Sequence, residues 1–396
     1  MILGIDLHNI RDGGGITYVA NLLRQFDPRR HAFRKIVLFG AADVLDQLPD
    51  SPAVEKKAYP GLRKGFLHRI AFLLFRLTGE TRKAGCDVLY APGGLYLGGF
   101  KPFVTISRNM LPFQRESWSL YPWGADRGRL YILRWLNAAA FRRASGVIFL
   151  THHAARVIGQ QAGRLKGKSV VIPHGVDRTR FRRSAGKPLT ERMGADQRIV
   201  LVCPARLEPY RHQIELVRAV ASLRSQFPKI ELVMCGPANR AYQNLLEREM
   251  QRLDPAGSYL HWRGLLPNAE LPALYDDAQM LVFASSCENL PNTLIEALCF
   301  GIPTVSSDVM PMPEIYGDAC RSFNPADSES ISVAIRDCLG DWEKTRRMVA
   351  SGQRNVQDYS WERCADRTFS FLASFACARQ SSPGPERVRL SGGATI

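Results

Sequence analysis

The stretch Leu281–Pro313, LVFASSCENLPNTLIEALCFGIPTVSSDVMPMP, decides the fold. Its apolar opening, Leu281–Ala284, predicts a short buried strand, and a polar loop follows. Pro291-Asn292 is predicted to start a helix of about ten residues that ends near Phe300, where Gly301 and Pro303 stop it. A second buried strand, Ile302–Val305, comes directly after it. A strand–helix–strand unit of this kind predicts parallel strands joined by a right-handed crossover.

Two carboxylates flank the start of this helix. Glu288 lies in the loop and Glu296 lies one turn into the helix. The free N–H groups of a first helical turn favour an anion such as a diphosphate. Carboxylates on either side would repel a bare phosphate but would accept hydrogen bonds from hydroxyl groups. The pattern therefore predicts a sugar at one end of a diphosphate and a ribose at the other.

A simpler interpretation exists for each of the two acids. Thr293 and Glu296 have the spacing of a capping box, in which the glutamate only satisfies backbone donors of its own helix. Glu288 could be a solvated loop residue. For either acid alone, the simpler interpretation is at least as good.

The whole string carries a resemblance that neither acid carries alone. Glu288 and Glu296 at this spacing, with Ala297-Leu298, Gly301-Ile302-Pro303 and Pro313-Glu314, closely resemble the signature of the retaining family 4 glycosyltransferases. The resemblance is to enzymes of bacterial surface-polysaccharide and lipopolysaccharide synthesis. It implies an α/β chain with two Rossmann-like domains facing across a cleft, the GT-B arrangement, and a C-terminal crossover helix.

The same resemblance implies a division of the chain. Residues 1–178 would form an acceptor-binding domain, completed by a crossover helix at 359–377, and residues 179–358 would bind the nucleotide-sugar. Val170–Asp177 is similar to the family's interdomain linker, in which a glycine serves as a hinge. Residues 380–396 are rich in Ser, Gly and Pro, which predicts a disordered tail.

The resemblance assigns catalytic roles by position. Arg206 and Arg211 stand where the family has an Arg and a Lys that clamp the diphosphate, and arginine keeps the charge while adding forked donors. Glu288 would hold the sugar hydroxyls. After the strand Phe103–Ile106 the family often has a His or Asp, whereas this chain has Arg108-Asn109. The catalytic residues expected are Glu288, Arg206, Arg211 and Asn109.

Donor contacts are expected at a glycine loop and at strand ends. The loop follows the first predicted strand, Ile2–Leu7, and precedes a helix over Ile16–Phe26, a corner that suits phosphate, although a flexible turn explains it equally well. A second strand end, after Trp262, resembles the family's contact with the nucleotide base. The expected donor-binding residues are Gly13, Gly14, Gly15, Arg263, Gly264, Asn289, Leu290, Asn292, Thr293 and Glu296.

The sequence has no D-x-D triplet and no His/Cys cluster with metal-ligand spacing. No metal and no cofactor are therefore expected, and the leaving diphosphate would be stabilised by Arg206, Arg211 and the helix N-terminus. The resemblance implies retention of anomeric configuration. The acceptor hydroxyl would attack on the leaving group's face, and a phosphate oxygen would take its proton.

Charge is unevenly placed along the chain. Residues 1–178 hold 27 Lys/Arg and 12 Asp/Glu, while residues 179–396 hold 26 and 25. The positive net charge therefore belongs almost entirely to the first half of the chain. An excess of positive charge attracts that half to an anionic membrane or a nucleic acid. Pro60–Arg76 is both apolar and cationic, which fits a membrane-interface helix or a buried helix with a basic outer edge, and the charge of the domain favours the membrane.

The expected compartment follows from composition. Nine scattered cysteines without a C-x-x-C pair predict buried thiols in a reducing cytoplasm. No apolar run approaches the length of a membrane span, and the first ten residues predict a strand rather than a secretory signal. We therefore expect a cytoplasmic protein that binds the inner face of the membrane and transfers sugar to a saccharide or lipid-linked acceptor.

Rival functions stay open at this point. A GT-B sugar-nucleotide epimerase or a phosphorylase shares the architecture, and a phosphorylase would need a lysine to hold its cofactor. A basic nucleic-acid-binding protein would explain the charge but not the glutamates. No recognised nucleic-acid-binding motif is present, so no nucleic-acid partner is expected.

Overall fold

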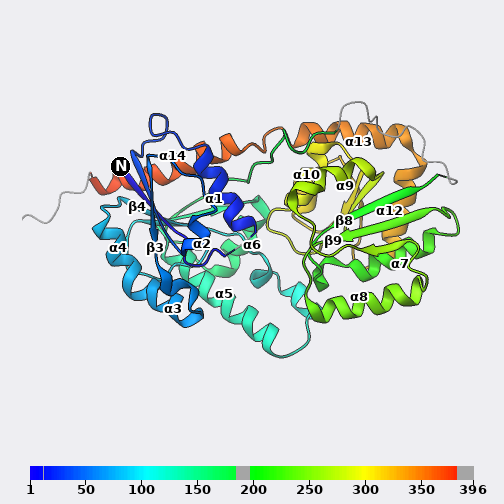
Figure 1. Ribbon diagram of the computed structural model, residues 1–396, viewed down its shortest axis with the longest axis horizontal. Coiled ribbons are helices and arrows are strands. Elements are labelled where there is room, and N and C mark those ends of the chain that lie inside the picture. The colour runs from blue at the N-terminus through cyan, green and yellow to red at the C-terminus, as the bar shows by residue number, and fades with distance from the viewer. Residues whose placement is uncertain (12, 184–196, 381–396) are drawn as a thin grey trace, which may run out of the picture.

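The computed structural model describes residues 1–11, 13–183 and 197–380. Two parallel sheets, each covered by helices, lie side by side (Figure 1), which confirms the predicted fold class. The predicted boundary at 178/179 falls between the last strand of the first sheet and the first strand of the second, and its exact position stays a prediction. The predicted tail, apart from residue 380, lies outside the described residues.

The first sheet has seven strands in the order β3-β2-β1-β4-β5-β6-β7. All of its strand pairs are parallel. Its strands are β1 (Ile2–Asp6), β2 (Lys35–Gly40), β3 (Val54–Ala58), β4 (Val88–Ala91), β5 (Phe103–Ile106), β6 (Gly146–Phe149) and β7 (Lys168–Val171). Its helices and turns are α1 (Gly14–Arg24), α2 (Ala42–Leu45), η1 (Pro60–Arg63), α3 (Phe66–Ala71), η2 (Phe72–Arg76), α4 (Leu77–Lys83), η3 (Leu111–Phe113), η4 (Arg115–Leu120), α5 (Ala125–Arg143) and α6 (His152–Ala162).

The second sheet has six strands in the order β10-β9-β8-β11-β12-β13, again all parallel. Its strands are β8 (Ile199–Pro204), β9 (Ile230–Cys235), β10 (Leu260–Trp262), β11 (Met280–Phe283), β12 (Thr304–Ser307) and β13 (Arg321–Phe323). Its helices are η5 (Pro209–Arg211), α7 (Gln213–Leu223), α8 (Arg240–Leu253), η6 (Asn268–Glu270), α9 (Leu271–Asp277), α10 (Asn292–Phe300), α11 (Met312–Tyr316), α12 (Ser328–Gly340) and α13 (Trp342–Asn355).

Both sheets reverse their strand order at one point, between β1 and β4 in the first and between β8 and β11 in the second. In open parallel sheets, ligands bind beyond the carboxyl ends of the strands at such a reversal. The residues that follow β1, β8 and β11 are the glycine loop, Arg206 and the loop with Glu288. The topology therefore brings these three segments to the ligand-binding edges of the two sheets.

The stretch that predicted the fold forms the expected unit. Strand β11 pairs in parallel with β12, and α10 connects them. The apolar side chains of α10 are buried, and Gly301 ends the helix with a φ of 81°, a conformation that favours glycine. The strand–helix–strand prediction is confirmed.

The last helix, α14 (Trp361–Gln380), returns to the first domain, as Figure 1 shows. It begins against the linker, where the N–H of Val176 donates to the carbonyl of Tyr359 at 3.0 Å. A Cβ atom at Gly175 would overlap the backbone of Ser360 and Trp361. Glycine at 175 is thus required by close packing of two chain segments, a reason beyond the flexibility expected of a hinge.

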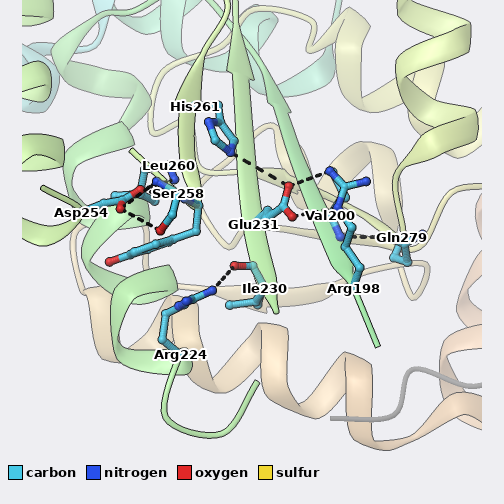
Figure 2. A network of polar contacts seen from close by, with 11 residues as sticks. Arg198, Val200, Arg224, Ile230, Glu231, Asp254, Ser258, Leu260, His261 and Gln279 are labelled. Atoms are coloured by element: carbon cyan, nitrogen blue, oxygen red, sulfur yellow. Dashed lines mark hydrogen bonds and ion pairs between the residues drawn. The ribbon is translucent and has the colours of Figure 1, made fainter. Parts of the chain in front are cut away.

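A network of polar contacts joins the strands of the second sheet at their amino ends (Figure 2). Arg198 makes two hydrogen bonds of 2.7 Å to Glu231 near the amino end of β9. The backbone N–H of Val200 donates to the side chain of Gln279 at 2.7 Å. These bonds join β8 to β9 and β11 at the amino ends of the strands, whereas the proposed ligand lies at the carboxyl ends. We therefore expect the bonds to stabilise the sheet rather than to contact a ligand.

The segment Pro60–Arg76 is not one surface helix. It is divided among η1, α3 and η2, and Leu62, Phe72 and Leu73 are buried in the core of the first domain. The interpretation as a domain helix with a basic outer edge therefore fits most of this segment. Every helix in the described part of the chain is too short or too polar to span a lipid bilayer.

Candidate active site

A cavity of about 270 Å³ lies between the two domains. Both domains, the linker and the start of α14 line it. Its lining residues are Gly14, Thr17, Tyr18, His174, Pro204, Ala205, Arg206, Arg211, Cys235, Gly236, Pro237, Leu265, Leu266, Leu271, Asn292, Thr293, Glu296 and Trp361. Six of the residues predicted from the sequence are among them: Gly14, Arg206, Arg211, Asn292, Thr293 and Glu296.

The glycine loop forms the first domain's wall. Gly13 precedes α1 with a φ of 58°, and Gly14 faces the cavity at the first position of the helix. Gly15 is buried behind it, where a Cβ atom would lie 3.1 Å from a guanidinium nitrogen of Arg108. Glycines here let α1 begin at the cavity and let the Arg108 guanidinium pack against the loop.

Arg108, rather than Asn109, reaches this wall. Its guanidinium lies over the ring of Tyr18, 5.6 Å from the ring centre, and burial lowers the pKa of Arg108. Asn109 is exposed and does not line the cavity, since its side-chain oxygen accepts the N–H of Leu111 at 3.1 Å. Arg108 does not line the cavity either, but its guanidinium lies against the glycine loop, and the catalytic role expected of Asn109 stays a prediction. The cue in the sequence was the position of Arg108, two residues after β5.

The second domain's wall is built at the ends of β8 and β9. Arg206 follows β8, is exposed, and lines the cavity. Gly236 follows β9 with a φ of 141°, and a Cβ atom there would overlap the carbonyl of Ala205. The bare backbone at Gly236 therefore lets the two strand ends approach each other closely, and it leaves room for a ligand beside Arg206.

Glu296 faces the cavity from the first turns of α10. The capping box that was the simpler interpretation of Glu296 is absent, since Pro291 precedes the helix and no side chain caps it. Burial raises the pKa of Glu296 to about 7, and the charge of Arg180 lowers it only in part. A half-buried carboxyl group that forms no ion pair with another described residue suits hydroxyl donors from a ligand.

Glu288 lies behind the cavity rather than in it. Its carboxylate forms an ion pair with Arg211, and both side chains are mostly buried, with exposed fractions of 10% and 17%. Burial opposes the charge of Arg211, but the neighbouring Glu288 more than compensates and raises the pKa of Arg211. The structure thus joins the predicted sugar-binding acid to one of the two predicted phosphate-binding cations.

The loop that contains Glu288 also holds the two domains together. Asn289 is buried, donates to the hydroxyl of Ser107 at 3.1 Å, and accepts the hydroxyl of Thr151 on its carbonyl at 3.2 Å. Leu290 is buried beside it. Neither residue lines the cavity, so the predicted donor contacts at 289 and 290 are interdomain and core contacts in this structure.

Glu314 makes a second interdomain contact. Its carboxylate accepts the backbone N–H groups of His152 and His153 at 2.7 and 2.9 Å. These are the first residues of α6, where an anion is favoured by the helix dipole. The acid of the Pro313-Glu314 pair therefore binds the other domain.

The strand end predicted to contact the nucleotide base lines the cavity only in part. Arg263 and Gly264 do not line the cavity, whereas Leu265 and Leu266 do. The N–H of Arg263 donates to the carbonyl of Met234 at 2.9 Å, and the carbonyl of Gly264 accepts the N–H of Gly236 at 2.7 Å. These two backbone groups serve the packing of the loop against β9.

His174 lies in the linker between the two sheets, as expected, and it also lines the cavity. Its ring stacks on Tyr18, with ring centres 4.6 Å apart, and on Trp361 at 5.7 Å. Burial, helped by the nearby Arg108, lowers the pKa of His174 to about 3. A neutral histidine between two aromatic rings could not be recognised from the sequence, because α1, the linker and α14 supply one ring each.

The described residues contain no group of three or more His, Cys, Asp or Glu side chains that could hold a metal ion. The cations beside the cavity are arginines. Arg206 and Arg211 line it, and Arg108 lies against the glycine loop. The site therefore offers positive charge from side chains, which suits a diphosphate.

Comparisons with known families divide the chain as the two sheets do. Residues 12–180 match the model described as "Glycosyltransferase Family 4", and residues 191–355 match "Glycosyl transferases group 1". The first model covers six of the seven strands of the first sheet, since β1 precedes residue 12, and the second model covers all six strands of the second sheet. The paired match covers most of the chain.

Two curated relatives are similar over part of their length. The chain is 29% identical to the O-antigen chain mannosyltransferase B of Escherichia coli over 168 residues, which is 41% of this chain and 43% of that protein. It is 30% identical over 224 residues to the GDP-mannose-dependent alpha-(1-6)-phosphatidylinositol monomannoside mannosyltransferase of Mycolicibacterium smegmatis, which is 53% of this chain and 57% of that protein. The chain thus spans about half the length of these relatives.

Solved structures share the fold over nearly the whole chain. Sucrose-phosphate synthase from Thermosynechococcus elongatus superposes with a TM-score of 0.76 at 17% identity, covering 95% of this chain and 99% of that one. Anabaena HepE in complex with UDP and glucose superposes with a TM-score of 0.69 at 19% identity, covering 94% and 99%. At these identities the likeness shows the fold alone.

Proposed function

This chain belongs to the GT-B glycosyltransferases. From that premise we propose that it moves a hexosyl group from a nucleotide-sugar to a saccharide or lipid-linked acceptor, and that mannosyl is the favoured hexosyl group. The observation that carries the proposal is the interdomain cavity. There Arg206, Arg211 and Glu296 of the second domain meet the glycine loop of the first. Two cations for a diphosphate and an acid for a ribose are thus brought into one space.

Relatives support the sugar that we propose. The two described above are named as mannosyltransferases, and one of them is named as dependent on GDP-mannose. HepE is described in complex with UDP and glucose. A screen for the donor therefore begins with GDP-mannose and includes UDP-glucose.

We propose that transfer occurs with retention and without a metal. The arginines at the cavity supply the charge that the leaving diphosphate needs. Glu296 is the single carboxylate among the described residues of the lining, and we assign it to the ribose. The acceptor hydroxyl would then attack on the face of the leaving group, and a phosphate oxygen would take its proton.

The proposal is tested by a thermal-shift panel followed by an assay of transfer. A donor that binds only the folded chain raises its melting temperature, so GDP-mannose or a related nucleotide-sugar should raise it while free mannose does not. Labelled sugar should then reach product only when an acceptor is added, which separates transfer from epimerisation. A panel that produces no shift and no product would remove the proposed function.

Glu296→Gln should weaken donor binding at pH 8 and abolish its dependence on pH. Because burial raises the pKa of Glu296 to about 7, the carboxylate that accepts ribose hydroxyl groups is lost as the pH falls from 8 to 6. Donor affinity should therefore fall over this range in the wild-type chain and stay level in the variant. Calorimetric titration of the donor at several pH values measures this.

The same substitution should also change how the free energy of unfolding depends on pH, which in the wild-type chain runs opposite to the pH dependence of donor affinity. The folded chain holds a proton on Glu296 that the unfolded chain releases at lower pH, so wild-type stability falls as the pH rises toward 7. Glu296→Gln should remove that fall, and the exposed control Glu343→Gln should leave it in place. Equal donor affinity in wild type and Glu296→Gln at pH 8 would contradict the ribose assignment.

We also propose that the first domain binds an anionic membrane, through a face defined by Phe75, Trp123, Tyr131, Ile132 and Trp135. These side chains are exposed, Phe75 by 83% and Trp123 by 88%. Helix α5 contains Tyr131, Ile132 and Trp135 together with Arg127, Arg129 and Arg134, whereas Phe75 lies in η2, directly after α3. Both α3 and α5 lie along the lower edge of the domain in Figure 1. Exposed aromatic rings among arginines suit the interface of an anionic bilayer.

Replacing Trp123 and Trp135 together by Ser should reduce binding to phosphatidylglycerol vesicles several-fold, because two interfacial anchors are lost. Sedimentation with vesicles measures the bound fraction. Val333→Ser removes an exposed apolar side chain from the second domain and should leave binding unchanged. Equal binding by the double variant would count against this face.

A further inference from the structure

The first domain contains a second cavity, of about 360 Å³, at the carboxyl ends of β1 and β2. Its lining includes His8, Arg11, Arg63 and Arg69, and it shares no lining residue with the interdomain cavity. Arg11, which lines this cavity, directly precedes the glycine loop, and Gly14 of that loop lines the interdomain cavity. The two cavities are thus neighbours across that loop, both at ligand-binding edges.

Positive charge dominates this second cavity. Three of its lining residues are arginines, and its lining carboxylate, Asp43, is bonded to Arg63 at 2.8 Å. No ion pair joins Arg11 or Arg69 to any residue of the part of the chain that the structure describes. Among the described residues, Arg11 and Arg69 therefore face the cavity without a matching anion.

A buried pair orients the imidazole in the same cavity. Nδ1 of His8 lies 2.8 and 2.7 Å from the two carboxylate oxygens of Asp6, and both side chains are almost fully buried. Because Asp6 occupies Nδ1, Nε2 is the ring nitrogen left for a ligand. A histidine held in this way meets a bound group in one orientation.

We propose that this second cavity binds a phosphoryl group of the acceptor, an inference that rests on the proposed function. A neutral saccharide needs hydroxyl partners, whereas guanidinium groups match phosphate oxygens by charge and by their forked geometry. An acceptor held by its phosphate beside Arg11 and Arg69 would lie next to the donor across the glycine loop. A lipid-linked saccharide diphosphate and a soluble sugar phosphate share this chemistry.

Titration with inorganic pyrophosphate tests the subsite without any substrate. The chain should bind pyrophosphate at two sites, of which Arg206→Ala weakens one and Arg69→Ala weakens the other by about tenfold to a hundredfold. Arg11→Ala should weaken the same site as Arg69→Ala. Arg82→Ala removes an exposed cation of the same domain outside the cavity and should change neither site. Unchanged affinities in both Arg69→Ala and Arg11→Ala would overturn the proposal.

A kinetic arm identifies the source of the phosphate. Transfer to a polyprenyl-diphosphate saccharide and transfer to a soluble sugar phosphate are compared with transfer to the same saccharide without phosphate. Arg69→Ala should raise the acceptor KM for the preferred phosphorylated acceptor only, with the donor KM unchanged. Equal kcat/KM for phosphorylated and unphosphorylated acceptors in the wild type would also overturn the inference.

The two proposals fail in different ways. Loss of a pyrophosphate site in Arg69→Ala, in a chain that transfers no sugar, would support the subsite and remove the proposed function. In the converse outcome, the chain transfers sugar while replacement of Arg69 or Arg11 leaves pyrophosphate binding unchanged. That result would support the proposed function and overturn the subsite.

Discussion

Replacing Arg211 by Ala is expected to lower the free energy of unfolding by about 3–5 kcal/mol, because it leaves the buried carboxylate of Glu288 without its cation. The same change removes a positive charge from the lining of the interdomain cavity. If that charge stabilises the leaving diphosphate, sugar transfer should fall by roughly 10²–10³-fold. Denaturant unfolding and kcat/KM for the donor measure the two effects.

A second substitution separates the structural part from the catalytic part. Glu288→Gln in the Arg211→Ala background removes the unpaired charge, so it should restore part of the lost stability but none of the activity. The control is Arg218→Ala, which breaks an ion pair between the half-exposed Arg218 and Glu249 and should cost about 0–1 kcal/mol. Full activity in Arg211→Ala, at any stability, would contradict the role in catalysis.

Replacing Arg206 by Ala is expected to reduce sugar transfer strongly while stability stays unchanged. Arg206 is exposed in the cavity and forms no ion pair with another described residue, so its loss leaves no partner unsatisfied. Losing one charge-assisted hydrogen bond to a developing diphosphate costs about 1.5–3 kcal/mol, or roughly one to two decades in kcat/KM.

Arg206→Lys should recover part of the activity, since it keeps the charge but not the forked donors. Arg347→Ala removes an exposed arginine of α13 outside the cavity, and it should change neither activity nor stability. A similar fall in activity in Arg206→Ala and in Arg347→Ala would mean that the general charge of the second domain, and not the site, is responsible.

The sequence by itself determined the strand–helix–strand unit around residues 281–305, whereas the two-domain arrangement was expected from the resemblance to a known family. Apolar runs such as Leu281–Ala284, punctuated by Gly301 and Pro303, already specify a strand, a helix and a parallel strand, because burial and chain reversal act on neighbouring residues. The same local logic placed Gly14, Arg206 and Thr293 at strand or helix ends, where the cavity lies. Position at such an end is a local property.

Only the tertiary structure decided which side chains meet. Glu288 pairs with Arg211, His174 stacks between Tyr18 and Trp361, and Asn289 binds the first domain instead of the cavity. Each of these contacts joins segments that lie far apart in the chain, so no spacing along the sequence encodes it. Their partners, burial and charge states arise when the two sheets and α14 pack together.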